Sequence, residues 1–174
     1  RHGITPDIVT MGKPMGNGLP IAGLVARREI LDDFGGSARY FNTFGGNPVC
    51  VAAAAAVLDV LDAEALPANA VATGVYLNDE LSRIARGSAV LGDVRGAGLY
   101  LGVDVITPAD GAPSPELASA IVNGMRRRRV LISATGPHGN VLKVRPPLPF
   151  LTEHADQFLA AFTDVLAATE QGGR

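Results

Sequence analysis

The sequence has a single cysteine, Cys50, among its 174 residues. One thiol cannot form a disulfide within the chain, which excludes a disulfide-stapled scaffold and fits a reducing compartment, so we expect a cytoplasmic location. Long hydrophobic runs are missing too, since the longest nearly apolar stretch, Val49 to Leu58, is too short to cross a bilayer. We therefore expect no membrane partner.

The sequence also lacks a large excess of charge of either sign. Its 15 lysines and arginines nearly balance its 17 aspartates and glutamates, which gives a net charge of -2. This balance gives no reason to expect nucleic acid as a partner.

The three histidines, His2, His138 and His154, stand far apart without metal-ligand spacing, so we expect no metal. The chain does contain material for a core, because 47% of its residues are hydrophobic and only 18% are charged.

Residues 1–64 have the pattern expected at the end of a large parallel α/β domain. Their predicted elements are two buried strands and two helices: strands within 6–11 and over 21–26, and helices over 28–34 and 49–62. The first helix is expected to stop at Gly35-Gly36, and the second is apolar nearly all round, which predicts burial on most sides. The segments 12–20 and 40–48 are rich in turn-forming residues and are predicted to be loops.

The remainder is predicted to be an interdomain helix, residues 65–89, followed by a small α+β C-terminal domain, residues 90–174. The stretch 90–106 indicates two strands joined around Gly96 and Gly98. The other predicted elements are two short strands and three helices: strands over 130–133 and 141–144, and helices over 67–86, 114–129 and 152–170.

Lys13 is the residue that most strongly suggests chemistry. It directly follows a predicted strand, in a loop whose glycines let the backbone approach a ligand closely. Ligands of α/β sheets bind at the carboxyl ends of strands, and a lysine there can attack a carbonyl to form a Schiff base. A phosphate loop is excluded, because Lys13 is followed by Pro14 and no glycine stands five residues before Gly12. A solvated loop lysine is the alternative.

Four motifs follow one another along the chain: PDIVTMGKPMGNGLP from residue 6, FNTFGGNP from 41, GDVRGAGLYLGVD from 92 and VLKVRPPLPF from 141. Together they resemble the class III aminotransferases, pyridoxal-phosphate enzymes of fold type I, over essentially the whole chain. Because these enzymes are much longer, and because the chain begins with Arg1 and shows no signal peptide, we expect it to be their C-terminal part. The family residues that pair with the cofactor's pyridine nitrogen and stack on its ring would lie upstream.

The resemblance implies that Lys13 binds pyridoxal 5'-phosphate (PLP) as a Schiff base. Once released by substrate, Lys13 would move a proton between the substrate and the cofactor, which suits a primary amine and not an arginine. It also implies that Thr43 donates to the cofactor phosphate of the neighbouring subunit, with Phe44 at the same interface, in a homodimer with shared active sites. A local turn role for Thr43 and a core position for Phe44 are the alternatives.

The substrate is indicated by the last motif. Where many relatives carry an arginine that grips a carboxylate, this chain has Lys143, and Arg145 directly precedes Pro146-Pro147. Lysine lacks the planar fork that matches a carboxylate but binds phosphate well. The chain looks most similar to the branch that contains ethanolamine-phosphate phospho-lyase and alanine–glyoxylate aminotransferase-like proteins.

We expect a transaminase that moves an amino group from an amine or amino acid to a 2-oxo acid, with Lys13 as the catalytic residue. The first alternative is a phospho-lyase acting on phosphoethanolamine or a similar phosphorylated amine. The second alternative is a non-catalytic remnant of the family. We expect the isolated segment to be inactive in each case, because the upstream cofactor contacts are missing.

Three further features have structural interpretations. Arg95 is expected to hold a tight turn through backbone hydrogen bonds. The run Arg126 to Arg129 ends a predicted helix, where the helix dipole favours cations, and no aromatics interleave to suggest nucleic acid. His138 lies in a GPHGN loop and is a minor candidate for a substrate contact, with a solvated turn histidine as the alternative.

Overall fold

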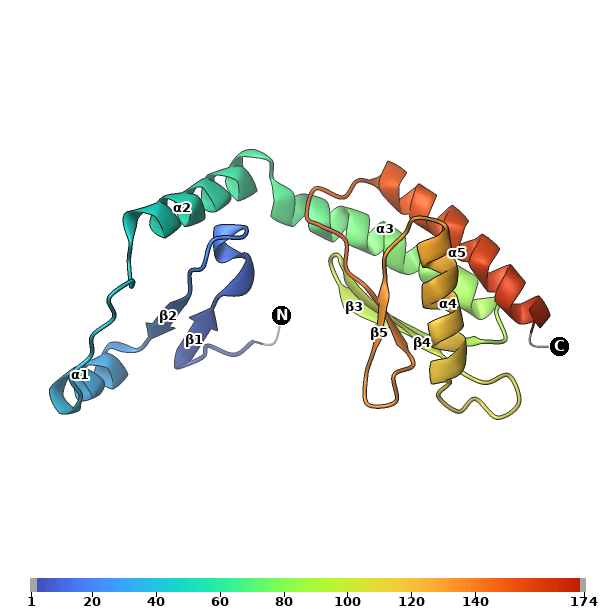
Figure 1. Ribbon diagram of the computed structural model, residues 1–174, viewed down its shortest axis with the longest axis horizontal. Coiled ribbons are helices and arrows are strands. Elements are labelled where there is room, and N and C mark those ends of the chain that lie inside the picture. Colours follow the sequence, from blue (N-terminus) through green and yellow to red (C-terminus); the bar gives the residue numbers. More distant parts are fainter. Residues whose placement is uncertain (1–2, 173–174) are drawn as a thin grey trace. The chain divides into compact units, whose positions relative to one another are not determined.

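The computed structural model describes residues 3–172. His2, for which we expect no metal role, lies outside the described residues. The chain forms two compact units, the first reaching to Glu64 and the second beginning at Ala65. Figure 1 draws the first unit in blue to teal and the second in green to red.

The first unit is built on an antiparallel hairpin. Its elements are β1 (Ile8–Met11), the 3-10 turn η1 (Lys13–Gly16), β2 (Gly23–Ala26), α1 (Arg28–Ser37) and α2 (Pro48–Ala63). β1 pairs with β2 in a register that sets Ile8 opposite Ala26, and α2 packs against η1 (Figure 1). Every strand pair within residues 3–172 is antiparallel, so the parallel strands expected of the large domain are not among them.

The predicted burial of this unit is wrong. Val25 of β2 is 59% exposed and Val49 of α2 is 70% exposed, and among the 16 residues of α2 only Cys50 is buried. A two-stranded hairpin and two helices do not make a second layer, so the apolar faces of both strands and helices stay in contact with solvent. Hydrophobic periodicity identifies an element that is made to be buried, but it does not say which segment covers it.

α1 continues past the glycines that were predicted to stop it. The Ser37 hydroxyl donates to the Asp33 carbonyl over 2.8 Å, and the Ala38 N–H donates to the Phe34 carbonyl over 2.8 Å. These bonds hold the last turn, so the helix ends at Ser37 and not before Gly35.

The second unit is a four-stranded antiparallel sheet, in the order β3-β4-β6-β5, with three helices. Its elements are α3 (Leu66–Arg86), β3 (Leu91–Ala97), β4 (Tyr100–Val105), α4 (Pro115–Arg127), β5 (Ser133–Thr135), β6 (Val141–Val144) and α5 (Thr152–Gly172). α3 and α4 contact the sheet, and α5 packs against both of these helices (Figure 1).

The core lies between the helices and one face of this sheet. Side chains alternate along a strand, so Leu142 and Val144 of β6 are buried, while Val141 and Lys143, which alternate with them, are half exposed. The largest fully buried side chains come from every layer: Phe162, Leu77, Leu81, Ile121, Met125, Leu142, Val103 and Val105. The second unit therefore has the core that the first unit lacks.

Glycines shape the turn between β3 and β4. Gly96 and Gly98 have positive φ of 154° and 52°, which side chains rarely adopt. Gly74 of α3 packs directly on this turn, since a Cβ at Gly74 would stand 2.3 Å from the backbone of Gly98. The prediction of two strands joined around Gly96 and Gly98 is confirmed, and the structure adds the helix that rests on them.

The strand predicted over 130–133 exists but has the wrong bounds, because β5 spans Ser133–Thr135 and shares only Ser133 with the predicted range. The residues before it complete the end of α4. Arg129 has a positive φ of 63°, and the Val130 N–H donates to the Met125 carbonyl over 3.0 Å. This is the backbone bond of a left-handed helix end, so these residues cap the helix and are not available to pair in the sheet.

Candidate functional site

Lys13 lies directly after β1, at the start of η1, in a strained backbone conformation. Its φ is 40°, in the left-handed region that residues other than glycine rarely adopt. The turn is closed by the Met15 N–H, which donates to the Gly12 carbonyl over 3.3 Å. The Lys13 side chain is exposed and has no polar partner within residues 3–172. Its amino group is therefore available to bond a carbonyl, and strain of this kind gathers at functional sites.

The rest of the lysine loop is fixed by tight turns. A Cβ at the buried Gly16 would stand 3.0 Å from the Ile21 side chain, so the loop folds closely over itself. Asn17 and Gly18 follow with positive φ of 44° and 111°, and the Asn17 N–H donates to the Pro14 carbonyl. Asn17 thus shapes the path of the loop through its backbone.

Thr43 lies in a turn organised by the side chain of its neighbour. The Asn42 Oδ1 accepts from the N–H of Phe44 over 3.2 Å and from the N–H of Gly45 over 3.0 Å. Thr43 is exposed, and its hydroxyl has no partner among the described residues. The turn thus presents this hydroxyl to solvent, where it can bind a further group.

The same loop starts α2. The Asn47 Oδ1 accepts from the Cys50 N–H over 3.0 Å, with Pro48 at the first helical position, so the predicted helix start is confirmed. Phe44 is 80% exposed, so its alternative interpretation as a core residue is wrong for this chain. Its place at an interface stays a prediction.

Lys13 and Thr43 are not joined by a hydrogen bond or ion pair anywhere in residues 3–172. Lys13 belongs to the turn that packs against α2, and Thr43 precedes that helix along the chain. The resemblance assigns Thr43 to the cofactor of the neighbouring subunit, which requires no contact with Lys13 of the same chain. Both roles stay predictions.

Lys143 stands in the middle of the sheet, on the face away from the core. In the β4–β6–β5 register it lies opposite Gly102 on one side and Ser133 on the other. Gly102 has no side chain to cover it, so the lysine is only half buried. Lys143 makes no ion pair with any described residue. It is a cation on an open sheet face.

Arg145 follows the end of β6 and is exposed. Pro146 disfavours a helical backbone at Arg145, so we expect the alternation of β6 to continue and to place Arg145 on the face of Lys143. Within the described residues Arg145 also has no ion-pair partner. Two unneutralised cations two residues apart are a reasonable place for an anion to bind.

Arg95 differs from its predicted role. Its guanidinium donates to the Asp104 carboxylate over 2.8 Å and to the Asp93 carboxylate over 3.1 Å, and not to backbone carbonyls of a turn. The bond to Asp104, and then that to Asp93, raise the pKa of Arg95 further above its usual range. Arg95 lies opposite Gly102 in the register. Arg95 is therefore neutralised by carboxylates, and it is separated from Lys143 in the sheet by Gly102 of β4.

Asn69, in the first turn of α3, was missed by sequence reasoning. Its Nδ2 donates to the Leu148 carbonyl over 2.8 Å and to the Phe150 carbonyl over 3.1 Å, so it holds the loop that follows Arg145. The residues are about 80 positions apart, and no motif links them. No sequence signal pointed to this role.

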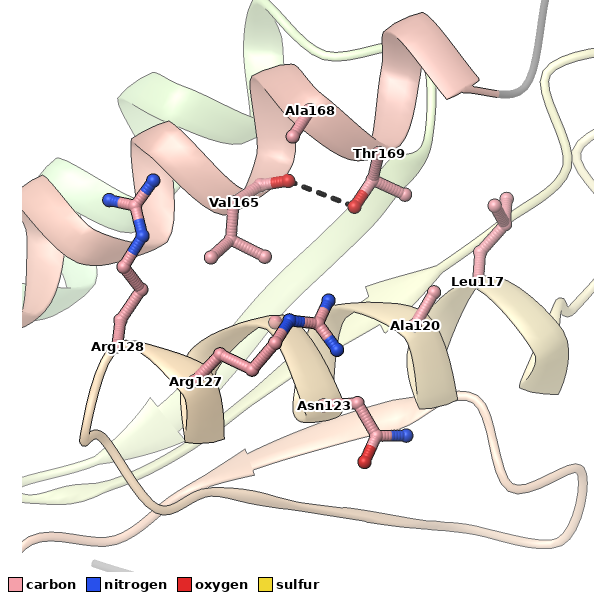
Figure 2. Close-up of a pocket in the computed structure, with 9 residues that line it drawn as sticks. Leu117, Ala120, Asn123, Arg127, Arg128, Val165, Ala168 and Thr169 are labelled. Atoms are coloured by element: carbon pink, nitrogen blue, oxygen red, sulfur yellow. Dashed lines mark hydrogen bonds between the residues drawn. The ribbon is translucent and has the colours of Figure 1, made fainter.

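The run Arg126 to Arg129 lies at the end of α4, as predicted, but its arginines have different positions and partners. Arg126 and Arg127 are in the last turn of α4, and Arg128 pairs with Asp164 of α5. A groove of about 690 Å³ lies between α4 and α5, and Figure 2 shows Arg127 extending along it while Arg128 reaches towards α5. The groove floor is made of small and apolar residues such as Ala120 and Val165, and Val165 uses its carbonyl to accept from Thr169.

His138 is exposed in the loop between β5 and β6, and a substrate contact there stays a prediction.

Among the described residues there is no cluster of three or more histidine, cysteine, aspartate or glutamate side chains that could hold a metal ion. The helices in that part of the chain include none that is long and apolar enough to span a membrane.

The site residues lie on motifs that a family model recognises. The model for aminotransferase class III matches residues 1–166. The chain belongs to the class III aminotransferases. Members of this family are PLP-dependent enzymes that act on amines or amino acids with 2-oxo acids, and the fold is a fragment of fold type I.

Individual relatives of this class III chain differ in their reactions. An alanine–glyoxylate aminotransferase 2-like protein of Drosophila melanogaster is 42% identical over 97% of the chain and 35% of its own length. Ethanolamine-phosphate phospho-lyase homolog 1 of Caenorhabditis elegans is 40% identical over 94% of the chain and 36% of its own length. The solved structure of a phospholyase from Arthrobacter in complex with phosphoethanolamine is 48% identical, with a TM-score of 0.93, over 95% of the chain and 40% of its own.

The chain therefore spans between a third and two fifths of the length of these relatives. These relatives have additional length of the kind that could cover apolar faces such as those exposed in the first unit.

Proposed function

We propose that the protein is a PLP-dependent phospho-lyase that removes phosphate from a phosphorylated primary amine of the phosphoethanolamine type. The observation that carries this proposal is the pair of cations at the end of β6, Lys143 and Arg145, which have no ion-pair partner among residues 3–172. A phosphate with nearly two negative charges near neutral pH satisfies two cations better than a single carboxylate does. The 48% identity to the Arthrobacter phospholyase supports it.

The residues present fit PLP. Lys13 offers an exposed amine at a strained turn, without a polar partner in the described part of the chain, and Thr43 offers an exposed hydroxyl that can donate to a phosphate. When bound, PLP supplies an electron sink that allows a proton to leave the carbon next to the substrate nitrogen.

Each residue then has a separate role. Lys13 holds the cofactor through Nζ and, once released, accepts the proton from that carbon. Removal of this proton would allow phosphate to leave the neighbouring carbon with the bonding electrons as a carbon–carbon double bond forms. Lys143 and Arg145 bind the phosphate before and during its departure.

Thr43 would serve the cofactor phosphate of the other subunit. The proposal therefore includes a homodimer with shared active sites, and the single cysteine supports a cytoplasmic location.

Transamination is the second candidate, and the one that the sequence alone favoured. The 42% identity to the alanine–glyoxylate aminotransferase 2-like protein supports it. Lys13 would accept the same proton at Nζ and would deliver it to a different carbon, and no phosphate would leave the substrate.

The two candidates are separated by products. Full-length enzyme is assayed for phosphate release from phosphoethanolamine and for amino transfer from alanine to glyoxylate, with Lys143→Ala and Arg145→Ala beside the wild type. Loss of one charge-assisted contact is expected to reduce kcat/KM for phosphate release by about tenfold or more. Ready amino transfer without any phosphate release would show that the phospho-lyase proposal is wrong.

A further inference from the structure

We propose that Asn69 is a positioning residue for anion binding, an inference that rests on the proposed function. Its side-chain amide donates to the carbonyls of Leu148 and Phe150, over 2.8 and 3.1 Å. These bonds hold the loop 146–150, which directly follows Arg145. Asn69 would thus act on substrate affinity through Arg145 without touching substrate.

The loop needs a donor from outside because it is rich in proline. Pro146, Pro147 and Pro149 have no N–H, so few donors are available within the loop to satisfy its carbonyls. Inside the loop, the Phe150 N–H donates to the Pro147 carbonyl over 3.0 Å. The side-chain amide nitrogen of Asn69 donates one hydrogen bond to the Leu148 carbonyl and another to the Phe150 carbonyl. A single side chain therefore fixes the far end of the loop.

Asn69 is itself held in place. The Thr73 hydroxyl, one turn further along α3, donates to the Asn69 Oδ1 over 3.3 Å, and Thr73 is 4% exposed. Next to Thr73, Gly74 packs against the backbone of Gly98. These contacts orient the amide so that its nitrogen, and not its oxygen, faces the loop.

Arg145 is consequently held from both sides. Before it, Val144 pairs with Leu101 in the sheet. After it, two prolines restrict the backbone up to Leu148, whose carbonyl Asn69 binds. Loss of the Asn69 hydrogen bonds would release the backbone on the side that follows Arg145. The guanidinium would then spend less time on the face of Lys143, and an anion would bind more weakly.

The test uses PLP-saturated full-length enzyme and compares Asn69→Ala with Arg145→Ala. Asn123→Ala is the matched control, because the Asn123 Nδ2 also donates to a backbone carbonyl, that of Ser119 within α4, but holds no loop. The measurements are KM and kcat for phosphate release from phosphoethanolamine, the inhibition constant of inorganic phosphate, and the absorption of the bound cofactor.

Asn69→Ala is expected to raise both the KM and the inhibition constant by about tenfold, the order of one charge-assisted contact, while kcat stays within about twofold. The cofactor absorption should be unchanged. Asn69→Gln, which keeps both donors on a longer side chain, should recover part of the affinity, and Asn123→Ala should change neither constant.

Other results would overturn the inference. If Arg145→Ala raises both constants and Asn69→Ala behaves like Asn123→Ala, the positioning role is wrong and the proposed function stands. If Asn69→Ala lowers kcat and leaves both constants unchanged, its role is a general structural one. If neither Arg145→Ala nor Lys143→Ala changes any constant, the assignment of these cations to the substrate fails first, and the positioning role fails with it.

Discussion

Lys13 holds a backbone conformation that would suit glycine better. A left-handed φ costs a residue with a side chain about 1–2 kcal/mol, and here the residue is a lysine whose amine has no partner among residues 3–172. Substitution by glycine would relieve this strain but would remove the amine. The chain therefore gives up local stability at the position where the resemblance implies covalent chemistry.

Reduction with borohydride should attach PLP irreversibly to Lys13 in the full-length enzyme, because it converts the carbon–nitrogen double bond to a stable amine. Peptide mapping identifies the labelled residue. Lys13→Gly should lose the label and gain about 1 kcal/mol of unfolding free energy relative to Lys13→Ala. Label on Lys143, or on a lysine outside this segment, would contradict the assignment.

Tyr76 gives the second unit a pH-dependent bond at the residue scale. Its hydroxyl donates to the Asp156 carboxylate over 2.5 Å, and this bond, more than burial or the charge of Asp156, raises the pKa of Tyr76. The neutral phenol is thus favoured in the folded state. Its contribution is complete below the ordinary tyrosine pKa of about 10 and is lost as pH rises through the higher folded value.

Tyr76 is therefore expected to ionise above the ordinary tyrosine pKa in a spectroscopic titration of the folded protein. The unfolding free energy should fall as pH rises above about 10, and Tyr76→Phe should remove part of that fall. Tyr100→Phe, a change at an exposed tyrosine, serves as the control. An identical pH dependence in wild type and Tyr76→Phe would argue against the bond.

Gly74 shows how an element can depend on a missing side chain. Glycine inside a helix usually costs about 1 kcal/mol relative to alanine. At this position a Cβ would stand 2.3 Å from the backbone of Gly98, and backbone cannot move aside as a flexible side chain can. α3 rests on the β3–β4 turn only because residue 74 has no Cβ.

Gly74→Ala is expected to lower the unfolding free energy of the second unit by about 1–3 kcal/mol, the cost of overpacking, and so to reverse the usual preference. Thermal unfolding measures the change. Gly36→Ala in α1 is the control, since a Cβ there meets nothing within 4 Å, and it should be neutral or stabilising. A stabilised Gly74→Ala variant would show that the helix does not pack this closely.

Elements were predictable from sequence where local signals define them. Asn47 with Pro48, and Ser114 with Pro115, are adjacent pairs that start a helix, and both starts are found in the structure. The bounds predicted for the strand at 130–133 were wrong because the left-handed end of α4 at Arg129 depends on a backbone bond that composition does not reveal.

The candidate site was predictable only in its motif residues. Lys13 and Thr43 stand in sequence patterns that carry a chemical meaning, whereas Asn69 acts on carbonyls about 80 residues away. The ion pairs of Arg95 likewise depend on the register between β3 and β4. Such partners are set by tertiary structure, so residue types and spacing along the chain do not identify them.

At the scale of the whole molecule, the two units differ in how well they are covered. The second unit has its own core, while in the first unit large side chains such as Phe41 and Val49 are 84% and 70% exposed. Exposed apolar patches of this kind mark surfaces that other chain segments or subunits cover. The class III relatives carry the additional length that could do so.

The isolated 174-residue chain is therefore expected to bind a hydrophobic dye strongly and to bind no PLP at a stoichiometric concentration. A chain limited to residues 65–174 should bind far less dye, because its apolar residues lie in one core. Dye fluorescence and analytical ultracentrifugation measure the difference. Tight PLP binding by the isolated 174-residue chain would show that Lys13 needs no upstream contacts.

The bonds between α3 and the end of the chain have a consequence for synthesis on the ribosome. Tyr76 binds Asp156, and Ser88 binds Glu170, across 80 and 82 residues. At about 5–20 residues per second, α3 waits roughly 4–16 s for these partners, whereas a helix forms in about a microsecond. Until α5 has emerged, the side of α3 that packs against α5 in the finished unit stays uncovered. A nascent chain paused before α5 would thus display an amphipathic helix of the kind that chaperones retain.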